Sequence, residues 1–225
     1  MHIPDGILPV SVVVSGYAAA GGLTWLSLSR IKKKFINPRQ VIPRASLLTA
    51  VFFVASLIHI PVPPTSVHLV LSGLVGVILG WFAFPAILVG LFFQAVMFQH
   101  GGLTTLGVNA CLMGIPALLA GAIFQARRFF GAKQKAVNGV LAFTGGFMAI
   151  ALGAVTAAPL LIYTIPAQFD AAAERAAIIT LSAAHLPVAL LEGVFTALVV
   201  VFLLRVKPEL LETEEYDRFG KTTGS

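Results

Sequence analysis

The stretch that decides the fold is the uncharged run Leu69–Gln99, LVLSGLVGVILGWFAFPAILVGLFFQAVMFQ. A membrane-spanning helix needs about 20 apolar residues, with a range of about 17–25, so this run is too long for one ordinary span. Gly80, Trp81 and Pro85 stand near its middle and are typical of a tight turn. We therefore predict two short spans here, over residues 67–82 and 85–99.

The composition of the whole chain agrees with membrane insertion. Of 225 residues, 58% are hydrophobic and only 11% are charged, and the mean hydropathy is +0.94. Soluble domains carry about 25% charged residues, and a water-soluble globule of this composition would lack polar side chains to cover its surface. The single cysteine, Cys111, excludes a disulfide framework and a cysteine-rich metal site.

Further stretches with few or no charges predict the remaining spans, which cover residues 8–29, 45–60, 103–126, 136–158 and 177–204. The expected fold is an all-α, polytopic membrane bundle of about seven helices. Residues 1–206 would form one membrane-embedded domain. Residues 207–225 are polar and would form a cytoplasmic tail.

The basic residues predict the orientation of these spans. They fall into three clusters, at 30–44, 127–135 and 205–221, which together hold 14 of the 15 Lys and Arg residues. Seven spans place all three clusters on one side, and the positive-inside rule makes that side the cytoplasm of a cytoplasmic-membrane protein. The N-terminus is then outside. Because no basic residue precedes the first apolar run, we expect an uncleaved span and no secretory signal peptide.

Histidines gather on the predicted outer side. His2, His68 and His100 lie in outer segments with Asp5, while His59 and His185 lie near outer span ends. Loop histidines are often simply solvated. A cluster beside a free N-terminus also suits metal binding, because neutral imidazole is the commonest protein ligand for nickel, copper, zinc and iron.

A histidine at position two has a particular chelating geometry. The terminal amine of Met1, the amide nitrogen of His2 and its ring nitrogen can bind one ion, and the fused chelate rings hold them toward one plane. A distant histidine can supply the fourth nitrogen, and His68 is the best candidate because the proline-rich segment 61–66 before it is stiff. Four planar nitrogens favour Ni(II) or Cu(II) over tetrahedral Zn(II).

Three motifs together resemble the CbiM/NikM family of substrate-binding membrane components in energy-coupling-factor (ECF) transporters for cobalt and nickel. They are Met1-His2-Ile3-Pro4-Asp5-Gly6, the segment PVPPTSVH at 61–68 and the run QAVMFQHGGLTTLGVN at 94–109. The resemblance covers most of the chain, except the tail from about residue 207.

The resemblance implies that the metal is held by the Met1 amine, by the His2 amide and ring nitrogens, and by the His68 ring. This chain departs from the family pattern at Pro64, where glycine is frequent, and at His100, where aspartate is frequent. At His100 a histidine replaces a negatively charged aspartate beside the site, and this change in charge bears on which metal the site prefers.

Other polar residues have two interpretations each. Asp5 either caps the turn after Pro4 or orients a ligand histidine. Asn109, like Gln94, either forms an interhelical hydrogen bond or belongs to a loop that closes over the metal, as the resemblance implies for the motif. His185 and Glu192 are seven residues apart and share a helix face. One interpretation is that the pair relays protons or binds a metal. The other is that the two side chains form hydrogen bonds with each other or with a backbone carbonyl.

The expected function is that of an ECF substrate-specificity subunit that captures Ni(II), or as a close second Co(II), at the outer membrane face. The chain contains no Gly-x-x-x-x-Gly-Lys-Ser/Thr motif, so ATP hydrolysis would come from partners. The resemblance implies two ATPase subunits, a transmembrane coupling subunit and a small accessory subunit. We expect no catalytic cofactor and no nucleic-acid partner.

Two other classes of function remain open. An intramembrane metalloprotease or serine hydrolase would require a His-Glu-x-x-His or Gly-x-Ser-x-Gly motif, and the chain has neither. An independent channel or secondary carrier would require charged or broken helices at the midplane, for which only His185 and Glu192 are candidates.

Overall fold

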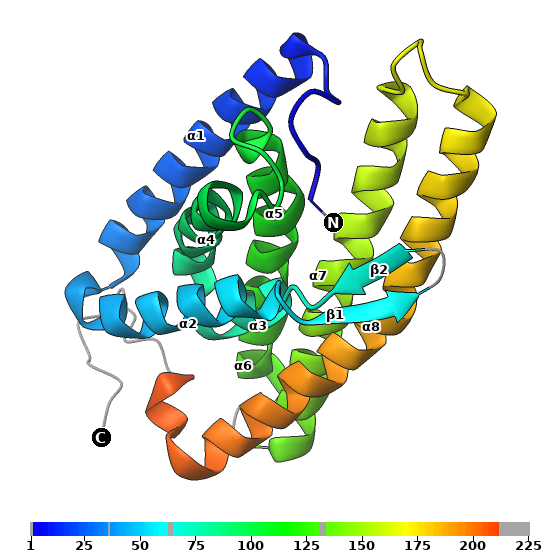
Figure 1. The fold of residues 1–225 in the computed structure, drawn as a ribbon. Helices are drawn as coiled ribbons and strands as arrows, with labels where there is room; N and C mark the ends of the chain where they lie inside the picture. Colours follow the sequence, from blue (N-terminus) through cyan, green and yellow to red (C-terminus); the bar gives the residue numbers. More distant parts are fainter. Residues whose placement is uncertain (1, 36, 63–64, 131–133, 212–225) are drawn as a thin grey trace.

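The computed structural model describes residues 2–35, 37–62, 65–130 and 134–211 as a helical bundle with a two-stranded hairpin (Figure 1). The helices are α1 (Val10–Lys34), α2 (Ile42–Ala55), α3 (Ser72–Leu79), α4 (Ala83–Phe98), α5 (Leu106–Gln125), α6 (Arg127–Phe130), α7 (Lys135–Tyr163) and α8 (Ala171–Val206). The hairpin joins β1 (His59–Val62) to β2 (Thr65–His68), and three short 3-10 helices are η1 (Pro38–Val41), η2 (Gly80–Phe82) and η3 (Pro208–Leu210).

Five helical segments of the described chain are long and apolar enough to cross a membrane. They are Val10–Lys34, Ser72–Phe98, Leu106–Phe130, Lys135–Tyr163 and Ala171–Val206. The predicted class, a mostly helical multi-pass membrane protein, is thereby confirmed. The count of seven stays a prediction, because α2 has 14 residues and α3 has eight, fewer than an ordinary span.

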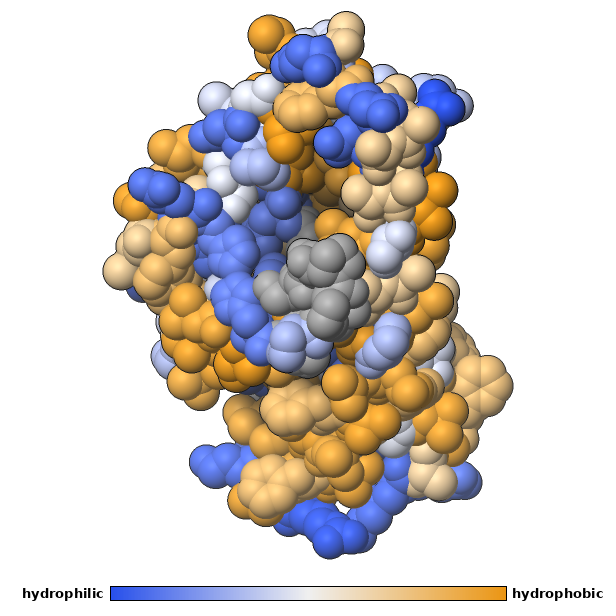
Figure 2. All heavy atoms as spheres, turned by 45° about the vertical axis from the view of Figure 1, so that its right-hand side comes forward, coloured by the Kyte–Doolittle hydropathy of each residue, from blue (hydrophilic) through white to orange (hydrophobic). Residues whose placement is uncertain are grey.

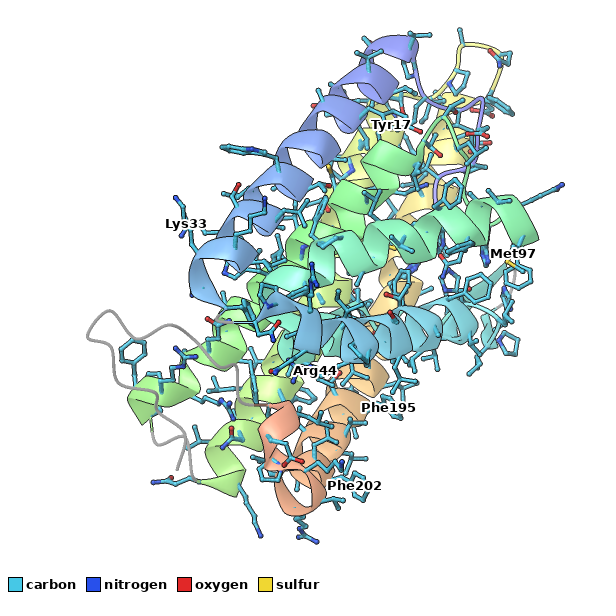
Figure 3. All side chains as sticks on the ribbon, turned by 90° about the vertical axis from the view of Figure 1, so that its left-hand side faces the viewer. Tyr17, Lys33, Arg44, Met97, Phe195 and Phe202 are labelled. Carbon is cyan, nitrogen blue, oxygen red and sulfur yellow. The ribbon has the colours of Figure 1, made fainter. Side chains whose placement is uncertain are left out.

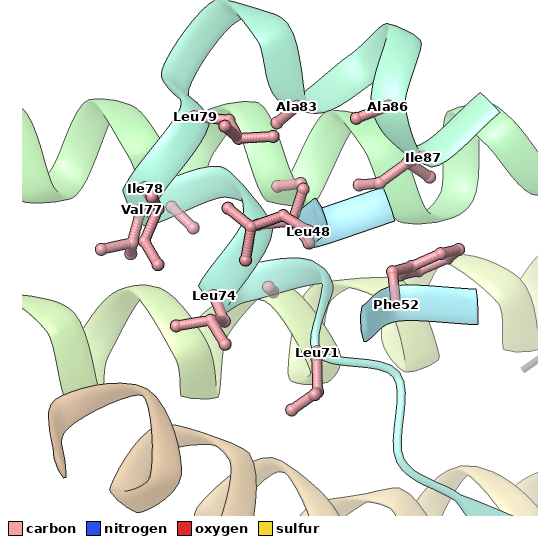
Figure 4. Close-up of a cluster of buried hydrophobic side chains, with 14 of the residues drawn as sticks. Leu48, Phe52, Leu71, Leu74, Val77, Ile78, Leu79, Ala83, Ala86 and Ile87 are labelled. Carbon is pink, nitrogen blue, oxygen red and sulfur yellow. The ribbon is translucent and has the colours of Figure 1, made fainter. Parts of the chain in front are cut away.

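The chain turns in the middle of the deciding stretch, as predicted. Helix α3 ends at Leu79, and Gly80 adopts a positive φ of 54°, which favours glycine. Figure 4 shows the chain changing direction between Leu79 and Ala83, where α4 begins after η2. All eight residues of α3 are buried, so this short helix forms part of the core.

The hairpin corrects two predicted span boundaries. The span predicted over 45–60 ends at Ala55, and the one predicted over 67–82 begins at Ser72. Between them β1 and β2 pair antiparallel, with His59 opposite His68. The physical cause is the proline content of this segment, because proline lacks a helical N–H and drives the residue before it into an extended conformation.

Three other boundaries were predicted too short. Helix α1 continues to Lys34 rather than 29, and α7 continues to Tyr163, past Pro159. Membrane helices tolerate an internal proline because neighbouring groups satisfy the freed carbonyl. Helix α8 begins at Ala171 rather than 177, because the Asp170 side chain accepts the backbone N–H of Ala172 at 2.9 Å and caps the helix.

Glycines allow α3 to lie close to its neighbours, as membrane helices commonly do. A Cβ atom on Gly73 would come within 2.6 Å of the Gly146 Cα in α7. A Cβ atom on Gly76 would collide with the carbonyl of Ala117 in α5. These two glycines therefore let α3 pack closely against both α5 and α7.

Two described arginines, from two different basic clusters, both contact the segment that follows α8. Arg44 donates a hydrogen bond to the carbonyl of Leu210, and Arg127 donates one to that of Leu211 at 2.6 Å. In Figure 3, Lys33 and Arg44 lie near the start of α2, while Met97 lies at the far end of α4. Figure 2 shows hydrophilic residues at the lower end, below a broad hydrophobic band.

The first residues of the predicted tail pack against the helices. Leu211 follows η3 and is buried, and its carbonyl accepts the hydrogen bond from Arg127. Residues 212–225, which make up the rest of the predicted tail, lie outside the described residues.

Candidate metal centre

Three histidines from separate parts of the chain meet at one site. The N-terminal segment carries His2 and lies between α5 and α7 (Figure 1), β2 ends at His68, and His100 follows α4 by two residues. The ring centroids lie 4.9 Å apart for His2–His68 and 4.8 Å apart for the other two pairs. One nitrogen from each ring lies within 4.8 Å of the other two. The group contains both predicted ring ligands and adds His100.

A buried glutamine on α4 determines which nitrogen of His2 carries a proton. The Gln94 side-chain amide donates to the Phe52 carbonyl at 3.3 Å, so its oxygen faces the other way. That oxygen lies 2.8 Å from Nε2 of His2, and an amide oxygen only accepts. Nε2 therefore carries the hydrogen, and Nδ1 of His2 retains a free lone pair.

A backbone carbonyl determines the tautomer of His68 in the same manner. Nδ1 of His68 donates to the carbonyl of Leu69 at 2.9 Å, which leaves the lone pair on Nε2. This Nε2 lies 3.1 Å from Nδ1 of His2. The lone pairs of these two nitrogens therefore face each other and repel. A cation bound between them would accept both lone pairs and remove this repulsion. Two nitrogens at right angles on one ion lie about 3 Å apart, because each metal–imidazole bond is about 2.0–2.1 Å.

Burial makes a proton a poor occupant of this position. Desolvation lowers the pKa of His2 well below its usual value, and the positive amino terminus and the two neighbouring imidazoles lower it further, against a smaller opposing effect of Gln94. Desolvation likewise lowers the pKa of His68 to about 3. Both imidazoles are therefore neutral at physiological pH, which is the state that binds metal.

The neutral histidines predict that the metal-free protein loses stability in acid. An unfolded histidine takes up its proton near pH 6.5, whereas folded His68 does so only near pH 3. Stability is therefore complete above pH 6.5 and falls as the pH is lowered toward 3, because the unfolded chain binds the extra proton. We expect His68 to contribute at most about 1.4 kcal/mol per pH unit, measured by thermal unfolding of the purified protein. An equally steep slope in His68→Gln would contradict this assignment.

Asp5 fastens the N-terminal segment to the loop between α4 and α5. Its carboxylate accepts the backbone N–H of Leu103 at 3.1 Å and of Thr104 at 2.9 Å, together with the Thr104 hydroxyl. The Thr104 hydroxyl bond is the main cause that lowers the pKa of Asp5. Asp5 therefore neither caps its own turn nor contacts a ligand histidine among the described contacts. Asp5 instead binds the loop that follows His100.

Asn109 completes this attachment from the first turn of α5. Its side-chain oxygen accepts the N–H of Ile3 at 2.9 Å, and its side-chain nitrogen donates to the Ile3 carbonyl at 3.0 Å. The Thr105 hydroxyl donates to the same carbonyl at 2.6 Å. Among the described contacts, the Asn109 side chain thus binds the residue after His2 and the Thr105 hydroxyl, and its role in a closing loop stays a prediction.

A methyl group at Gly102 should disrupt this attachment. A Cβ atom there would collide with the Asp5 carboxylate and lie 2.7 Å from the Asp5 backbone nitrogen. We expect Gly102→Ala to destabilise the protein by about 1–3 kcal/mol and to weaken Ni(II) binding, measured by thermal unfolding and by titration. Gly22→Ala is the matched control, because no atom lies within 4 Å of its added Cβ. Equal behaviour of the two variants would contradict the role of Asp5.

The remaining candidate residues lie outside the group of three. His59 is exposed, and its ring is 6.0 Å from that of His68 and 5.8 Å from that of His100. Nδ1 of His185 donates to the Leu181 carbonyl at 2.7 Å, while its buried Nε2 has no hydrogen-bond partner among the described residues. Met1, a predicted ligand through its amine, lies outside the described residues, as does Pro64.

Glu192 supports the site through the backbone after His68. Its buried carboxylate accepts the N–H groups of Val70 and Leu71, the latter at 2.9 Å. Glu192 thus binds backbone groups, as the structural interpretation expects, whereas His185 does so through Nδ1 alone. Sequence reasoning missed this role, as it missed the contact of Gln94 with His2. The available signal was a polar residue at bilayer depth, where a partner is required.

The comparisons with known proteins agree with this architecture. The family model described as "CbiM: Cobalt uptake substrate-specific transmembrane region" matches residues 2–210. A putative metal transport protein of Haemophilus influenzae is 31% identical, over 96% of this chain and 98% of that protein. The fused nickel transport protein NikMN of Rhodobacter capsulatus is also 31% identical, and the match covers 94% of this chain and 64% of that protein.

A solved structure has the same fold. The crystal structure of a truncated transition metal transporter superposes with a TM-score of 0.73 at 26% identity, over 91% of this chain and 99% of that one. The family and these relatives are metal transport proteins and not enzymes. The chain belongs to the CbiM family and is a multi-pass transmembrane component of cobalt or nickel uptake.

Proposed function

We propose that this chain is the subunit that captures Ni(II), or Co(II) as a close second, from the outer side of the cytoplasmic membrane, as the cargo of an ECF-type importer. The observation that carries the proposal is the 3.1 Å approach of His2 Nδ1 to His68 Nε2. Gln94 and Leu69 hold the two rings in the tautomers that expose these lone pairs. Both imidazoles are neutral and largely withdrawn from water, which strengthens their attraction for a cation.

The proposed ligands are the Met1 amine, the His2 amide and ring nitrogens, and the His68 ring. A chelate that includes the residue's own amide nitrogen uses Nδ1, because this closes a six-membered ring. Nδ1 is the nitrogen of His2 that faces His68. Four nitrogens in one plane favour Ni(II), whereas the family description names cobalt.

The proposed topology has seven crossings, with the N-terminus outside and the C-terminus in the cytoplasm. Residues 1–206 would be membrane-embedded and residues 207–225 cytoplasmic. The contacts of Arg44 and Arg127 with the carbonyls of residues 210 and 211 support one basic, cytoplasmic end. The histidines lie near the C-terminal end of α4, away from that end.

The proposed partners are two ATPase subunits, a transmembrane coupling subunit and a small accessory membrane subunit. The sequence lacks a phosphate-binding loop, so energy must come from another chain. In this scheme the loop after His100 closes over the captured ion, and ATP hydrolysis drives reorientation of the subunit. Deprotonation of the amide nitrogen would make capture weaker in acid.

Nickel uptake by cells that express the complete transporter tests this proposal. Three alanines encoded ahead of Met1 move the terminal amine away from His2, so we expect uptake to fall at least about tenfold, given the cost of losing a ligand. The same three residues added after Ser225 are the control and should leave uptake unchanged. Undiminished uptake by the amino-terminal variant would contradict the ligand set. Uptake that persists without ATP hydrolysis would favour a channel or carrier.

A further inference from the structure

The chain path after α4 directs a third imidazole toward the same site. Gln99 has a left-handed conformation with φ of 52°, and the next backbone N–H, that of His100, donates to the Gln94 carbonyl at 3.1 Å. Gly101, with φ of 83°, then lies against the His2 ring. This turn brings the ring of His100, six residues after Gln94, to 4.8 Å from the ring of His2, which Gln94 orients.

The three rings are arranged for one face of a metal ion. Their centroids form a nearly equilateral triangle with sides of 4.8 to 4.9 Å. The donor nitrogens of His2 and His68 are 3.1 Å apart, and one nitrogen from each of the three rings lies within 4.8 Å of the other two. The three imidazoles therefore surround one small volume.

The distances allow one ion to contact all three rings. Opposite nitrogens on one ion are at most about 4.2 Å apart, because each bond is about 2.1 Å long. The three donor nitrogens lie within 4.8 Å of one another, and His68 is buried while His2 and His100 are half-buried. A small movement of the His100 side chain would bring its nitrogen into range. His100 is half-buried and lies between two residues with positive φ, Gln99 and Gly101.

We propose that His100 supplies an axial imidazole to the captured ion and makes this site five-coordinate. The inference rests on the proposed function, in which the Met1 amine, the His2 nitrogens and His68 occupy the plane. Since those four positions are filled, only a position above the plane is left for His100.

An axial nitrogen changes which ions the site accepts. Ni(II) with four planar nitrogens is diamagnetic, whereas an added axial nitrogen makes it paramagnetic. Co(II) has less preference for the plane and accepts five or six ligands readily, so His100 narrows the advantage of nickel over cobalt. His100 is thus a specificity-determining residue.

The test uses the purified full-length protein in detergent, loaded with one equivalent of Ni(II). We expect a paramagnetic ion by the NMR shift of a reference signal, and a diamagnetic ion with a planar absorption spectrum in His100→Ala. The ratio of the cobalt to the nickel dissociation constant should rise at least about tenfold in His100→Ala. His59→Ala, which removes a neighbouring exposed imidazole, should remain paramagnetic.

The possible outcomes separate this inference from the proposed function. Tight nickel binding with a diamagnetic ion in both the unaltered protein and His100→Ala would overturn the axial role and leave capture intact. A paramagnetic ion in both would also overturn it. The absence of nickel binding by the unaltered protein would contradict capture itself, and the role of His100 with it.

Discussion

Replacement of His68 by alanine is expected to lower the affinity of the purified protein for Ni(II) by at least about 100-fold. The loss of a residue that only orients a metal ligand costs about 10–100-fold, and His68 is proposed as a ligand itself. Its Nε2 lies 3.1 Å from His2 Nδ1, and its Nδ1 is held by the Leu69 carbonyl. The measurement is an equilibrium titration of Ni(II) against a competing chelator.

His59→Ala is the matched control for this experiment. His59 lies opposite His68 in the hairpin and is exposed, with its ring 6.0 Å from that of His68. The substitution His59→Ala therefore removes an imidazole from the same hairpin without removing a proposed ligand. We expect the affinity for Ni(II) to change less than about threefold, near the ±0.5 kcal/mol of ordinary surface substitutions. Equal losses in the two variants would show that the hairpin, and not the His68 nitrogen, is required.

Replacement of Gln94 by leucine is expected to weaken Ni(II) binding by about 10–100-fold. The amide oxygen of Gln94 holds the proton of His2 on Nε2, and without it the ring can place its proton on Nδ1, the nitrogen that faces His68. Gln94 is fully buried, so leucine fills similar space without an acceptor. Titration with Ni(II) measures the affinity, and ring-nitrogen NMR shifts of the metal-free protein report the tautomer.

The variant Gln94→Glu distinguishes the effect of Gln94 on the His2 tautomer from its effect on packing. Its carboxylate can accept the same Nε2 hydrogen, although the bond from Gln94 to the Phe52 carbonyl is lost. We expect an affinity closer to that of the unaltered protein than to that of Gln94→Leu. If Gln94→Leu retains full affinity and the same tautomer, Gln94 does not orient His2.

The parts of the fold that depend on local composition were predicted from the sequence. The low charge predicted a multi-pass helical protein, and Gly80 predicted the break inside the deciding stretch. The hairpin at 59–68 was missed because a short apolar run is compatible with either a helix or a strand. Its proline residues were interpreted only as a stiff loop, although they also prevent a helix.

Of the three histidines that meet at the site, His2 and His68 were predicted as ligands from the sequence and His100 was not. Chelate chemistry identifies His2 from its position in the chain, and the outer location selects His68. His100 approaches them only because the turn at Gln99 and Gly101 and the Asp5 contacts fold its loop back. Such contacts join residues about 100 positions apart, and no local pattern in the sequence reports them.

The central claim is that one metal ion binds between Nδ1 of His2 and Nε2 of His68. Anomalous diffraction at the nickel absorption edge, from crystals of the full-length protein grown with Ni(II), tests it most directly. We predict one strong anomalous peak about 2.1 Å from each of these two nitrogens, the length of a metal–imidazole bond. A peak elsewhere, with the two rings unchanged and these nitrogens still 3.1 Å apart, would contradict the claim.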